Sequence, residues 1–232
     1  MKIYAISDLH FGEAIGKDMD MFGEKWIGHK EKIITNWKNT VNDDDIVLIA
    51  GDTSWATSLE DAKHDLDIVA SLPGKKIISR GNHDYWWKSL YKLNNLYNNI
   101  SFIQNDSIFM MDDIAICATK GYLCPNDDKF SRADEKIYKR ELERLKIALK
   151  ATSKKNVKFT VLLLHYPPTN DKLEVSEFIK IIEMYNVNKV VYGHLHGRSY
   201  YKDGLQGVHN GVEYMLTSAD YLNFKPKLVI SK

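Results

Sequence analysis

Hydrophobic positions along the first part of the chain alternate between short continuous runs and longer stretches with helical spacing. Apolar runs at 3–6 and 46–50, together with the segment 75–79, predict β-strands. Between and after them, apolar residues recur every three or four positions at 24–41, 59–69 and 86–97, which predicts helices. Strands that are apolar throughout and alternate with helices are typical of parallel βαβ units. The first half of the chain therefore predicts an α/β fold.

The second half mixes several patterns. Strands at 107–111 and 114–119 flank Asp112-Asp113 and predict a hairpin. A second hairpin is predicted from 207–209 and 212–217, because Asn210-Gly211 suits a type I′ turn in which both central residues need positive φ. Helices at 133–150 and 178–185 and strands at 159–164 and 189–192 complete the pattern. No linker or break in composition is visible, so we expect a single domain over residues 1–232.

Polar motifs interrupt this pattern in a fixed order, and four of the five follow a predicted strand. They are Asp8-Leu9-His10, Gly51-Asp52, Gly81-Asn82-His83-Asp84, His165 and Gly193-His194-Leu195-His196. Strand ends in an α/β sheet converge on one crevice, so residues distant in sequence can share a site. Oxygen and imidazole donors without thiolate suit two adjacent divalent ions that activate water for phosphoryl-ester hydrolysis.

Each motif taken alone has an ordinary explanation. Asp52 could be a turn residue after Gly51, Gly81-Asn82 could form a simple turn, and His165 could be a loop histidine. The two i, i+2 pairs are more suggestive, because residues two apart in an extended strand end point the same way. The ordered set of five favours a metal site. The remaining histidines, His29, His64 and His209, are interpreted as structural.

Composition excludes several other classes. Apolar residues make up 44% and charged residues 27% of the chain, and the formal net charge is +1 without a dense Lys/Arg block. The sequence therefore shows no long electrostatic footprint for nucleic acid. Cys117 and Cys124 have neither metal nor redox spacing, and a disulfide between them is the less favoured interpretation. No signal peptide or membrane span is predicted, which indicates a cytoplasmic protein.

The ordered motifs resemble those of the calcineurin-like metallophosphoesterases, whose pattern runs D-x-H, G-D-x-x-[D/E], G-N-H-[D/E], a later histidine and G-H-x-H. The resemblance spans residues 8–196. More narrowly, the segments around Trp26, Trp86-Trp87 and Tyr221 resemble an uncharacterised bacterial phosphohydrolase branch of the family. The resemblance implies a two-sheet sandwich with helices outside, the α/β/β/α architecture.

The resemblance also implies two metal-binding positions. One ion would be bound by Asp8, His10, Asp52 and His196. The other would be bound by Asp52, Asn82, His165 and His194, with Asp52 bridging. His83 would contact the phosphate or protonate the leaving group, and Asp84 would orient His83. Without a sulfur ligand, Mn, Fe, Zn and Co all fit this site.

The expected function is hydrolysis of a small-molecule phosphoester by in-line attack of a hydroxide that bridges the two ions. Two alternatives stay open. The enzyme could be a phosphodiesterase or nucleotide pyrophosphatase rather than a monoesterase, or the chain could be a non-catalytic interaction scaffold on the same fold.

The chain departs from the family pattern at one position of the second motif. Trp55 occupies the place of the acidic residue, and the arginine of the G-D-x-x-D-R-G motif is absent, which argues against a Ser/Thr protein phosphatase. Long irregular stretches at 11–25 and 121–132 are candidate binding loops. Tyr85, Trp86 and Trp87 follow the third motif and could stack on a base, but a core position is favoured for both tryptophans.

Overall fold

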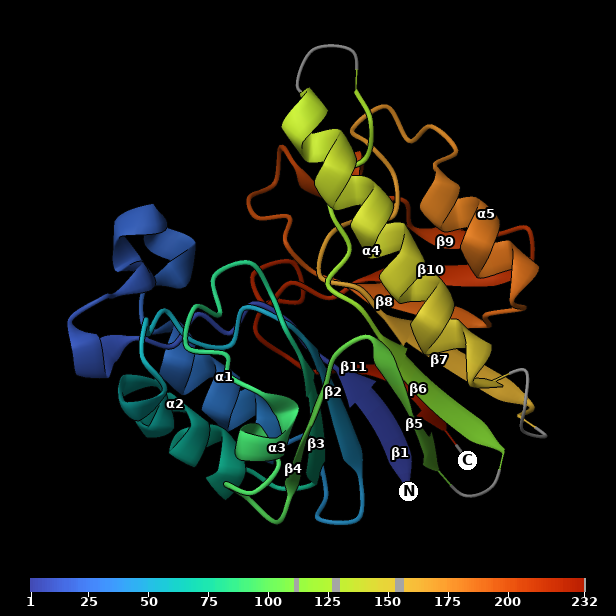
Figure 1. Ribbon diagram of the computed structural model, residues 1–232. Helices are drawn as coiled ribbons and strands as arrows, with labels where there is room; N and C mark the ends of the chain where they lie inside the picture. The colour runs from blue at the N-terminus through green and yellow to red at the C-terminus, as the bar shows by residue number, and fades with distance from the viewer. Residues whose placement is uncertain (111–112, 127–129, 153–156, 232) are drawn as a thin grey trace. The chain divides into compact units, whose positions relative to one another are not determined.

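The computed structural model describes residues 1–110, 113–126, 130–152 and 157–231 (Figure 1). The chain divides into two compact units, one formed by residues 1–102 with 217–232 and the other by residues 103–216. Each unit contains one multi-strand sheet with its own helices. The predicted α/β class with two sheets is therefore confirmed.

The first unit is organised around a five-stranded sheet in the order β11-β1-β2-β3-β4. The strands β1 (Lys2–Ala5), β2 (Ile46–Ala50) and β3 (Lys75–Ser79) are neighbours and run parallel, as the apolar runs predicted. The strand β4 (Ile100–Ile103) lies at one edge, and β11 (Lys227–Ser231) pairs antiparallel with β1 at the other. The carboxyl ends of β1, β2 and β3 therefore open on the same edge of this sheet.

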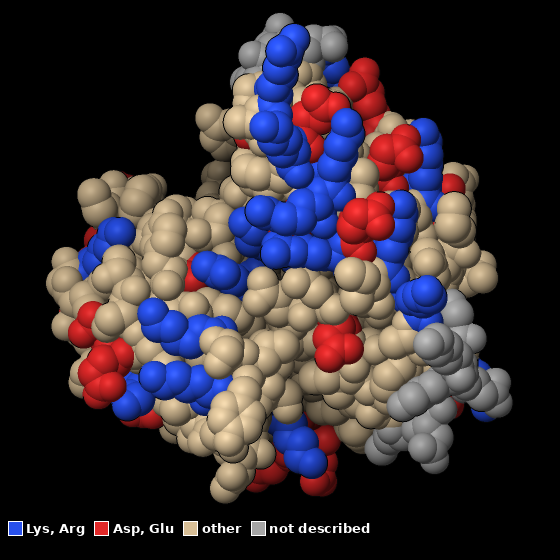
Figure 2. All heavy atoms as spheres, in the orientation of Figure 1, with Lys and Arg blue, Asp and Glu red and all other residues tan. Residues whose placement is uncertain are grey.

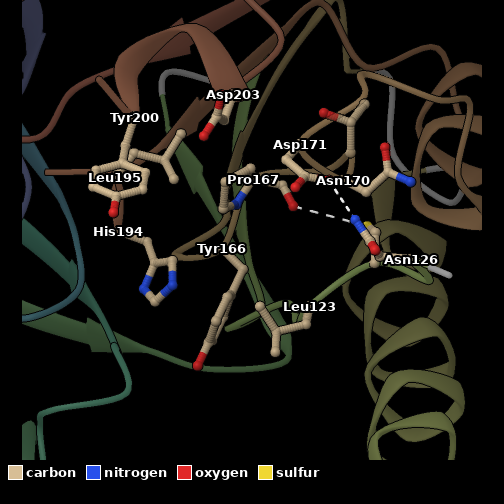
Figure 3. Close-up of a pocket in the computed structure, with 12 residues that line it drawn as sticks. Leu123, Asn126, Tyr166, Pro167, Asn170, Asp171, His194, Leu195, Tyr200 and Asp203 are labelled. Atoms are coloured by element: carbon tan, nitrogen blue, oxygen red, sulfur yellow. Dashed lines mark hydrogen bonds between the residues drawn. The ribbon is translucent and has the colours of Figure 1, made fainter. Parts of the chain in front are cut away.

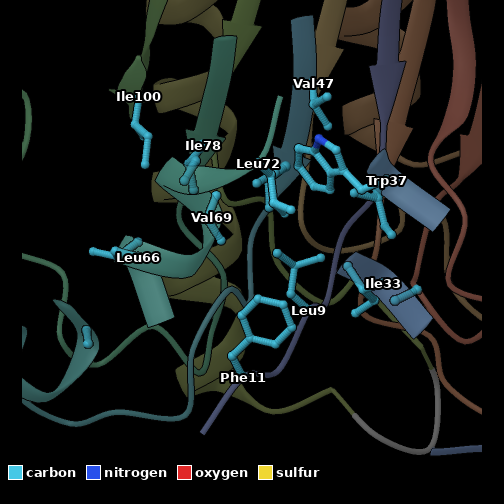
Figure 4. Close-up of a cluster of buried hydrophobic side chains, with 14 of the residues drawn as sticks. Leu9, Phe11, Ile33, Trp37, Val47, Leu66, Val69, Leu72, Ile78 and Ile100 are labelled. Atoms are coloured by element: carbon cyan, nitrogen blue, oxygen red, sulfur yellow. The ribbon is translucent and has the colours of Figure 1, made fainter. Parts of the chain in front are cut away.

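Helices α1 (His29–Lys38) and α2 (Leu59–Ser71) supply apolar side chains to the core of this unit (Figure 4). Ile33 and Trp37 of α1 and Leu66 and Val69 of α2 are buried in one cluster with residues of the strands. Ser58 caps the start of α2, because its side chain accepts a hydrogen bond from the amide of Asp61. These apolar stripes fix the helices that connect the three parallel strands.

Two predicted helices of this unit differ from the structure. The stretch 24–41 is broken at Gly28, whose φ of 62° lies in the left-handed region, so the 3₁₀ turn η3 (Glu24–Trp26) precedes α1. The stretch 86–97 contains only the short helix α3 (Leu90–Leu93). Trp86 and Trp87 are buried, which confirms their predicted core position. The segment 11–25 also contains the 3₁₀ turns η1 (Glu13–Ile15) and η2 (Met19–Phe22).

The second unit contains a six-stranded sheet in the order β5-β6-β7-β8-β10-β9. Its four central strands run parallel: β6 (Ile114–Ala118), β7 (Phe159–Leu163), β8 (Lys189–Tyr192) and β10 (Val212–Leu216). The edge strands β5 (Asp106–Met110) and β9 (Gly207–His209) pair antiparallel with β6 and β10. Both predicted hairpins are thus confirmed, and Asn210 and Gly211 have the expected positive φ of 49° and 83°. Asp112 of the first predicted turn lies outside the described residues.

Helix α4 (Arg132–Lys150) packs against β5, β6 and helix α5 (Glu177–Met184). A capping box between Ser131 and Asp134 starts α4. Lys and Arg side chains gather over α4 with Asp and Glu between them (Figure 2), and several form ion pairs three or four residues apart on the helix. This surface is a mixed charged helix face of the usual solvent-exposed kind.

Three further features complete the description. A 3₁₀ turn, η5 (Tyr201–Asp203), follows β8. Cys117 and Cys124 are both buried and free. Among the described residues, no helix combines the length and the apolar character that crossing a membrane requires. Of the predicted irregular stretch 121–132, residues 127–129 lie outside the described part of the chain.

Candidate metal centre

The loops that follow β1 and β2 carry the first two motifs and are joined through their backbones. The amide of Asp8 donates to the carbonyl of Gly51 at 3.0 Å, and the amide of His10 donates to the carbonyl of Asp52 at 3.1 Å. These bonds extend the parallel β1–β2 pairing beyond the strands. Two loops more than forty residues apart in sequence therefore run side by side, with Asp8, His10 and Asp52 at one place.

The side chains of these three residues form a compact set of metal-binding groups. Nε2 of His10 lies 4.0 Å from Oδ1 of Asp8 and 3.8 Å from Oδ2 of Asp52. A carboxylate oxygen of Asp8 lies within 4.8 Å of one of Asp52, and all three residues are buried. Two buried carboxylates at this separation repel each other, and a divalent cation between them relieves that repulsion. The donor chemistry of this set fits a divalent metal ion.

The backbone at the predicted ligands is held in an unusual conformation. Asp8, His10 and Asp52 have φ values of 58°, 47° and 53°, and His194 in the second unit has a φ of 72°. Non-glycine residues rarely occupy this left-handed region. The conformation costs roughly 1 kcal/mol or more for each residue and persists only where the surrounding structure enforces it. Such residues concentrate at functional sites. Four of the seven predicted ligands share this feature.

Asp84 connects the second and third motifs as a buried hydrogen-bond acceptor. Its Oδ2 accepts from the amides of Gly81 at 2.7 Å and Asp52 at 3.0 Å. Its Oδ1 accepts from the amides of Thr53 at 2.9 Å and Ser54 at 3.4 Å, and from Nε1 of Trp86 at 3.1 Å. One carboxylate thus satisfies five N–H groups from two turns about thirty residues apart. It fixes the turn that carries Asp52 against the turn that carries Asn82 and His83.

Gly81 allows these two turns to approach closely. A Cβ atom at this position would lie 2.0 Å from Oδ1 of Asp52 and 2.3 Å from its backbone nitrogen. Next to it, the amide of His83 donates to the same Oδ1 at 2.8 Å. The carboxylate of Asp52 is therefore set on one side by the His83 backbone, and only a residue without a side chain fits beside it.

His83 is half-buried and lies in an aromatic group centred on Trp55. The Trp55 ring stacks on His10 with centroids 4.7 Å apart and an angle of 24°, and its centroid lies 4.3 Å from that of His83. On the segment 11–25, Nζ of Lys17 lies 4.1 Å from the centroid of the Trp55 ring, and Nε1 of Trp55 donates to Sδ of Met19 at 3.1 Å. Trp55 thus connects this segment to both histidines.

The second unit has histidines at the ends of two neighbouring strands. His165 follows β7 and His194 follows β8, and Nε2 of His165 lies 3.3 Å from Nδ1 of His194. Two nitrogen ligands of a tetrahedral ion with bonds of about 2.0–2.1 Å are roughly 3.3–3.4 Å apart, so this spacing suits two ligands of one ion. His196, two residues further on, is half-buried, as is Asn82 of the first unit.

Parallel strands with carboxylate and imidazole donors at their carboxyl ends define an α/β metalloprotein. The sequence profile of the calcineurin-like phosphoesterase family matches residues 1–198. The chain therefore belongs to the calcineurin-like phosphoesterase family, and its two-sheet α/β fold agrees with that family. It is a metal-dependent phosphoesterase, and its cofactors are divalent metal ions.

Solved structures of similar fold cover nearly the whole chain. A phosphopantetheinyl hydrolase (PptH) from Mycobacterium tuberculosis is 16% identical with a TM-score of 0.60, covering 100% of this chain and 96% of its own. A protein of unknown function, AQ665 from Aquifex aeolicus, is 20% identical with a TM-score of 0.53, covering 98% and 95%. TT1561 of Thermus thermophilus is 12% identical with a TM-score of 0.58, covering 98% and 97%. At these identities the likeness is one of fold. No match was found among curated proteins.

Sequence reasoning missed two features of the first unit. Besides its predicted role of orienting His83, which stays a prediction, Asp84 accepts hydrogen bonds from backbone amides of both turns. Trp55 was noted only as a departure from the family pattern, and its stacking on His10 was not expected. The expectation that His29 is structural agrees with its burial, which lowers its pKa, and with its contact to the carbonyl of His10.

Proposed function

We propose that this protein hydrolyses a small-molecule phosphoester with two divalent ions. The ligands of one ion are Asp8, His10, Asp52 and His196, and those of the other are Asp52, Asn82, His165 and His194. The observation that supports this most directly is the buried set in the first unit, where Nε2 of His10 lies within 4.0 Å of two carboxylates. The order of the motifs and the family membership support the remaining assignments.

The roles of the protein groups follow from their positions. When bound, the ions supply an activated water and neutralise charge on the phosphoryl oxygens. His83 is assigned to neither ion, so its imidazole protonates the leaving oxygen or binds the phosphate. The backbone of His83 keeps one oxygen of Asp52 in place. Asp84 holds the backbone of both turns, so it acts as a positioning residue for Asp52, Asn82 and His83.

The assignment of Asp52 is tested by metal content. Asp52→Asn is expected to lower the metal content of the purified protein from two ions per chain to fewer than one, and to abolish phosphoesterase activity. Asp45→Asn is the matched control, because Asp45 is also buried and accepts backbone amides from Lys2 and Asn42 outside the site. Two ions retained in Asp52→Asn, measured by elemental analysis, would contradict the bridging role.

The role of His83 is tested with two kinds of leaving group. A positioned general acid contributes about 10²–10⁴-fold, and only when the leaving group needs a proton. His83→Ala is therefore expected to keep its metal ions and lose about 10²-fold or more in kcat/KM on alkyl phosphates, with a clearly smaller loss on p-nitrophenyl phosphate. An equal loss on both substrates would assign His83 to phosphate binding instead.

A substrate panel separates the kinds of phosphoesterase. The purified enzyme with added Mn²⁺ is assayed on phosphomonoesters, phosphodiesters and nucleoside diphosphates, each with phosphate or alcohol release as the readout. We expect the highest kcat/KM on a monoester. A diester or pyrophosphate hydrolysed faster than every monoester would overturn this part of the proposal.

A further inference from the structure

A pocket in the second unit lies beside His194, one of the proposed ligands (Figure 3). His194 lines this pocket together with Tyr166, whose ring centroid lies 4.1 Å from that of the histidine. In Figure 3, His194 and Tyr200 are on one side of the pocket and Asp171 is on the other. A group bound here would therefore lie next to an atom that we assign to the metal centre.

The size of the pocket indicates a small ligand. Its volume is about 210 Å³, whereas pockets for drug-sized molecules measure roughly 300–1,000 Å³. The wall also includes leucine, proline and two tyrosine side chains, so it is largely apolar. Such a wall suits a compact organic group better than a second phosphate or a sugar with many hydroxyls.

The charge of the wall is negative. Asp171 and Asp203 both line the pocket, and none of its described lining residues is Lys or Arg. Oδ1 of Asp171 accepts a hydrogen bond from the neutral amide side chain of Asn126. In the described part of the chain, the Asp203 carboxylate forms no hydrogen bond or ion pair. A small apolar space with two carboxylates raises the local concentration of cations and repels anions.

Two further groups in the wall point to a ligand. Tyr200 lines the pocket and its side chain is 58% exposed, so a ligand can reach its ring, and aromatic rings attract ammonium groups within about 6 Å of their centroids. Thr169 also lines the pocket and is only 5% exposed, yet its Oγ1 has no hydrogen-bond partner among the described residues. A buried hydroxyl without a partner is costly.

We propose that this pocket binds the alcohol part of the substrate and that this alcohol carries an ammonium group. The substrate class is then the phosphate monoester of an amino alcohol. This inference rests on the proposed function, because it assigns the leaving group of the same reaction. Hydrolysis breaks the bond between phosphorus and the alcohol oxygen, water provides the new oxygen on phosphorus, and a proton goes to the alcohol. The products are inorganic phosphate and the amino alcohol.

A pair of substrates that differ only in charge tests the inference. Phosphocholine and its carbon isostere, 3,3-dimethylbutyl phosphate, have nearly the same shape. We expect kcat/KM to be about tenfold higher for phosphocholine, and 2-phosphoglycolate, whose alcohol is anionic, to be slower than both. Asp203→Asn is expected to lower the ratio of the first two substrates at least threefold.

Glu143→Gln is the matched control, because Glu143 lies on α4 of the same unit and pairs with Lys146 outside the pocket. It removes the same charge and should leave the ratio unchanged. Comparing each variant with the wild type cancels the intrinsic difference in reactivity between the two substrates. A ratio that is the same in the wild type and Asp203→Asn would overturn the inference.

Binding of the alcohols alone separates this inference from the proposed function. Choline and 3,3-dimethylbutanol are titrated calorimetrically into the wild type and Asp203→Asn. Tighter binding of choline that depends on Asp203 would support the pocket even if no phosphoester were hydrolysed, in which case the proposed function alone would fail. Hydrolysis of phosphoesters without charge-selective binding would reject the pocket and keep the proposed function. A nucleoside monophosphate preferred over phosphocholine would also reject it.

Discussion

Asp84→Asn should be among the most damaging single-atom changes in this protein. The side chain is fully buried and its two oxygens accept five N–H groups. Asparagine has one oxygen and one NH₂ group at these positions. If the NH₂ group replaces Oδ2, the amides of Gly81 and Asp52 face another donor. If it replaces Oδ1, three N–H groups do, so at least two donors are affected in either orientation. They lose their acceptor.

The magnitude follows from these bonds. A buried donor without an acceptor costs about 1–3 kcal/mol, so two of them cost about 2–6 kcal/mol of unfolding free energy. For a chain of this size, 1 kcal/mol corresponds to roughly 2–4 °C in Tm. Asp84→Asn should therefore lower Tm by about 4–24 °C. Because the same bonds hold Asp52 and His83, kcat/KM should also fall by about 10²-fold or more.

Thermal unfolding followed by circular dichroism, together with kcat/KM on p-nitrophenyl phosphate below the transition, measures both effects. Asp45→Asn is the matched control, since each oxygen of Asp45 accepts one backbone amide and only one donor is lost on substitution. It should lower Tm by about half as much and leave kcat/KM unchanged. If Asp84→Asn lowered kcat/KM without lowering Tm more than Asp45→Asn does, Asp84 would only orient His83 and the reasoning would be refuted.

Four other changes have defined outcomes. Gly81→Ala would place Cβ 2.0 Å from Oδ1 of Asp52, so kcat/KM and metal content should both fall at least tenfold. Trp55→Ala should lower metal affinity by removing the stack on His10, and Trp55→Phe should restore most of it in a metal titration. Burial lowers the pKa of Lys76 from 10.5 to about 8. Between pH 8 and 10.5 the unfolded state therefore binds more protons than the folded state. The unfolding free energy of the wild type, relative to that of Lys76→Met, should rise by up to about 3 kcal/mol over this pH range, as measured by urea titrations. EDTA should abolish activity, Mn²⁺ should restore it, and a loss of far-UV circular dichroism in the metal-free protein would show that the ions also hold the fold.

Most of the strands could be predicted because they contain apolar runs bounded by polar or glycine residues. The edge strands β4 and β11 were not predicted. Turn chemistry was equally informative at Asn210-Gly211, where the residue types dictate positive φ. Helix length was predicted less well. The stretch 86–97 has apolar residues at helical spacing, but Trp86 donates its Nε1 to the buried Asp84, so the spacing there reflects burial in the core and not a helix.

The placement of the site residues at strand ends could also be predicted, because it depends only on the local pattern of a strand followed by a polar motif. The contacts of Asp84 and Trp55 could not. Both sets of contacts join a turn that follows one strand to a loop or turn that follows a neighbouring strand. The local sequence does not specify such tertiary contacts. Gly81 gave a partial signal, since a glycine before a predicted ligand often marks a close backbone approach.

Trp55 has an electrostatic consequence that an acidic residue at the same position would not have. Asp8 and Asp52 already place two negative charges beside His10. A third carboxylate at position 55 would orient the imidazole through a hydrogen bond, but it would also add negative charge where a phosphate must bind. The tryptophan orients His10 by stacking and adds no charge. Nζ of Lys17 lies 4.1 Å from the centroid of the Trp55 ring, which brings a positive charge near it. The substitution therefore makes the first unit less anionic around the proposed ligands while keeping the ring of His10 fixed, and this favours a phosphorylated substrate.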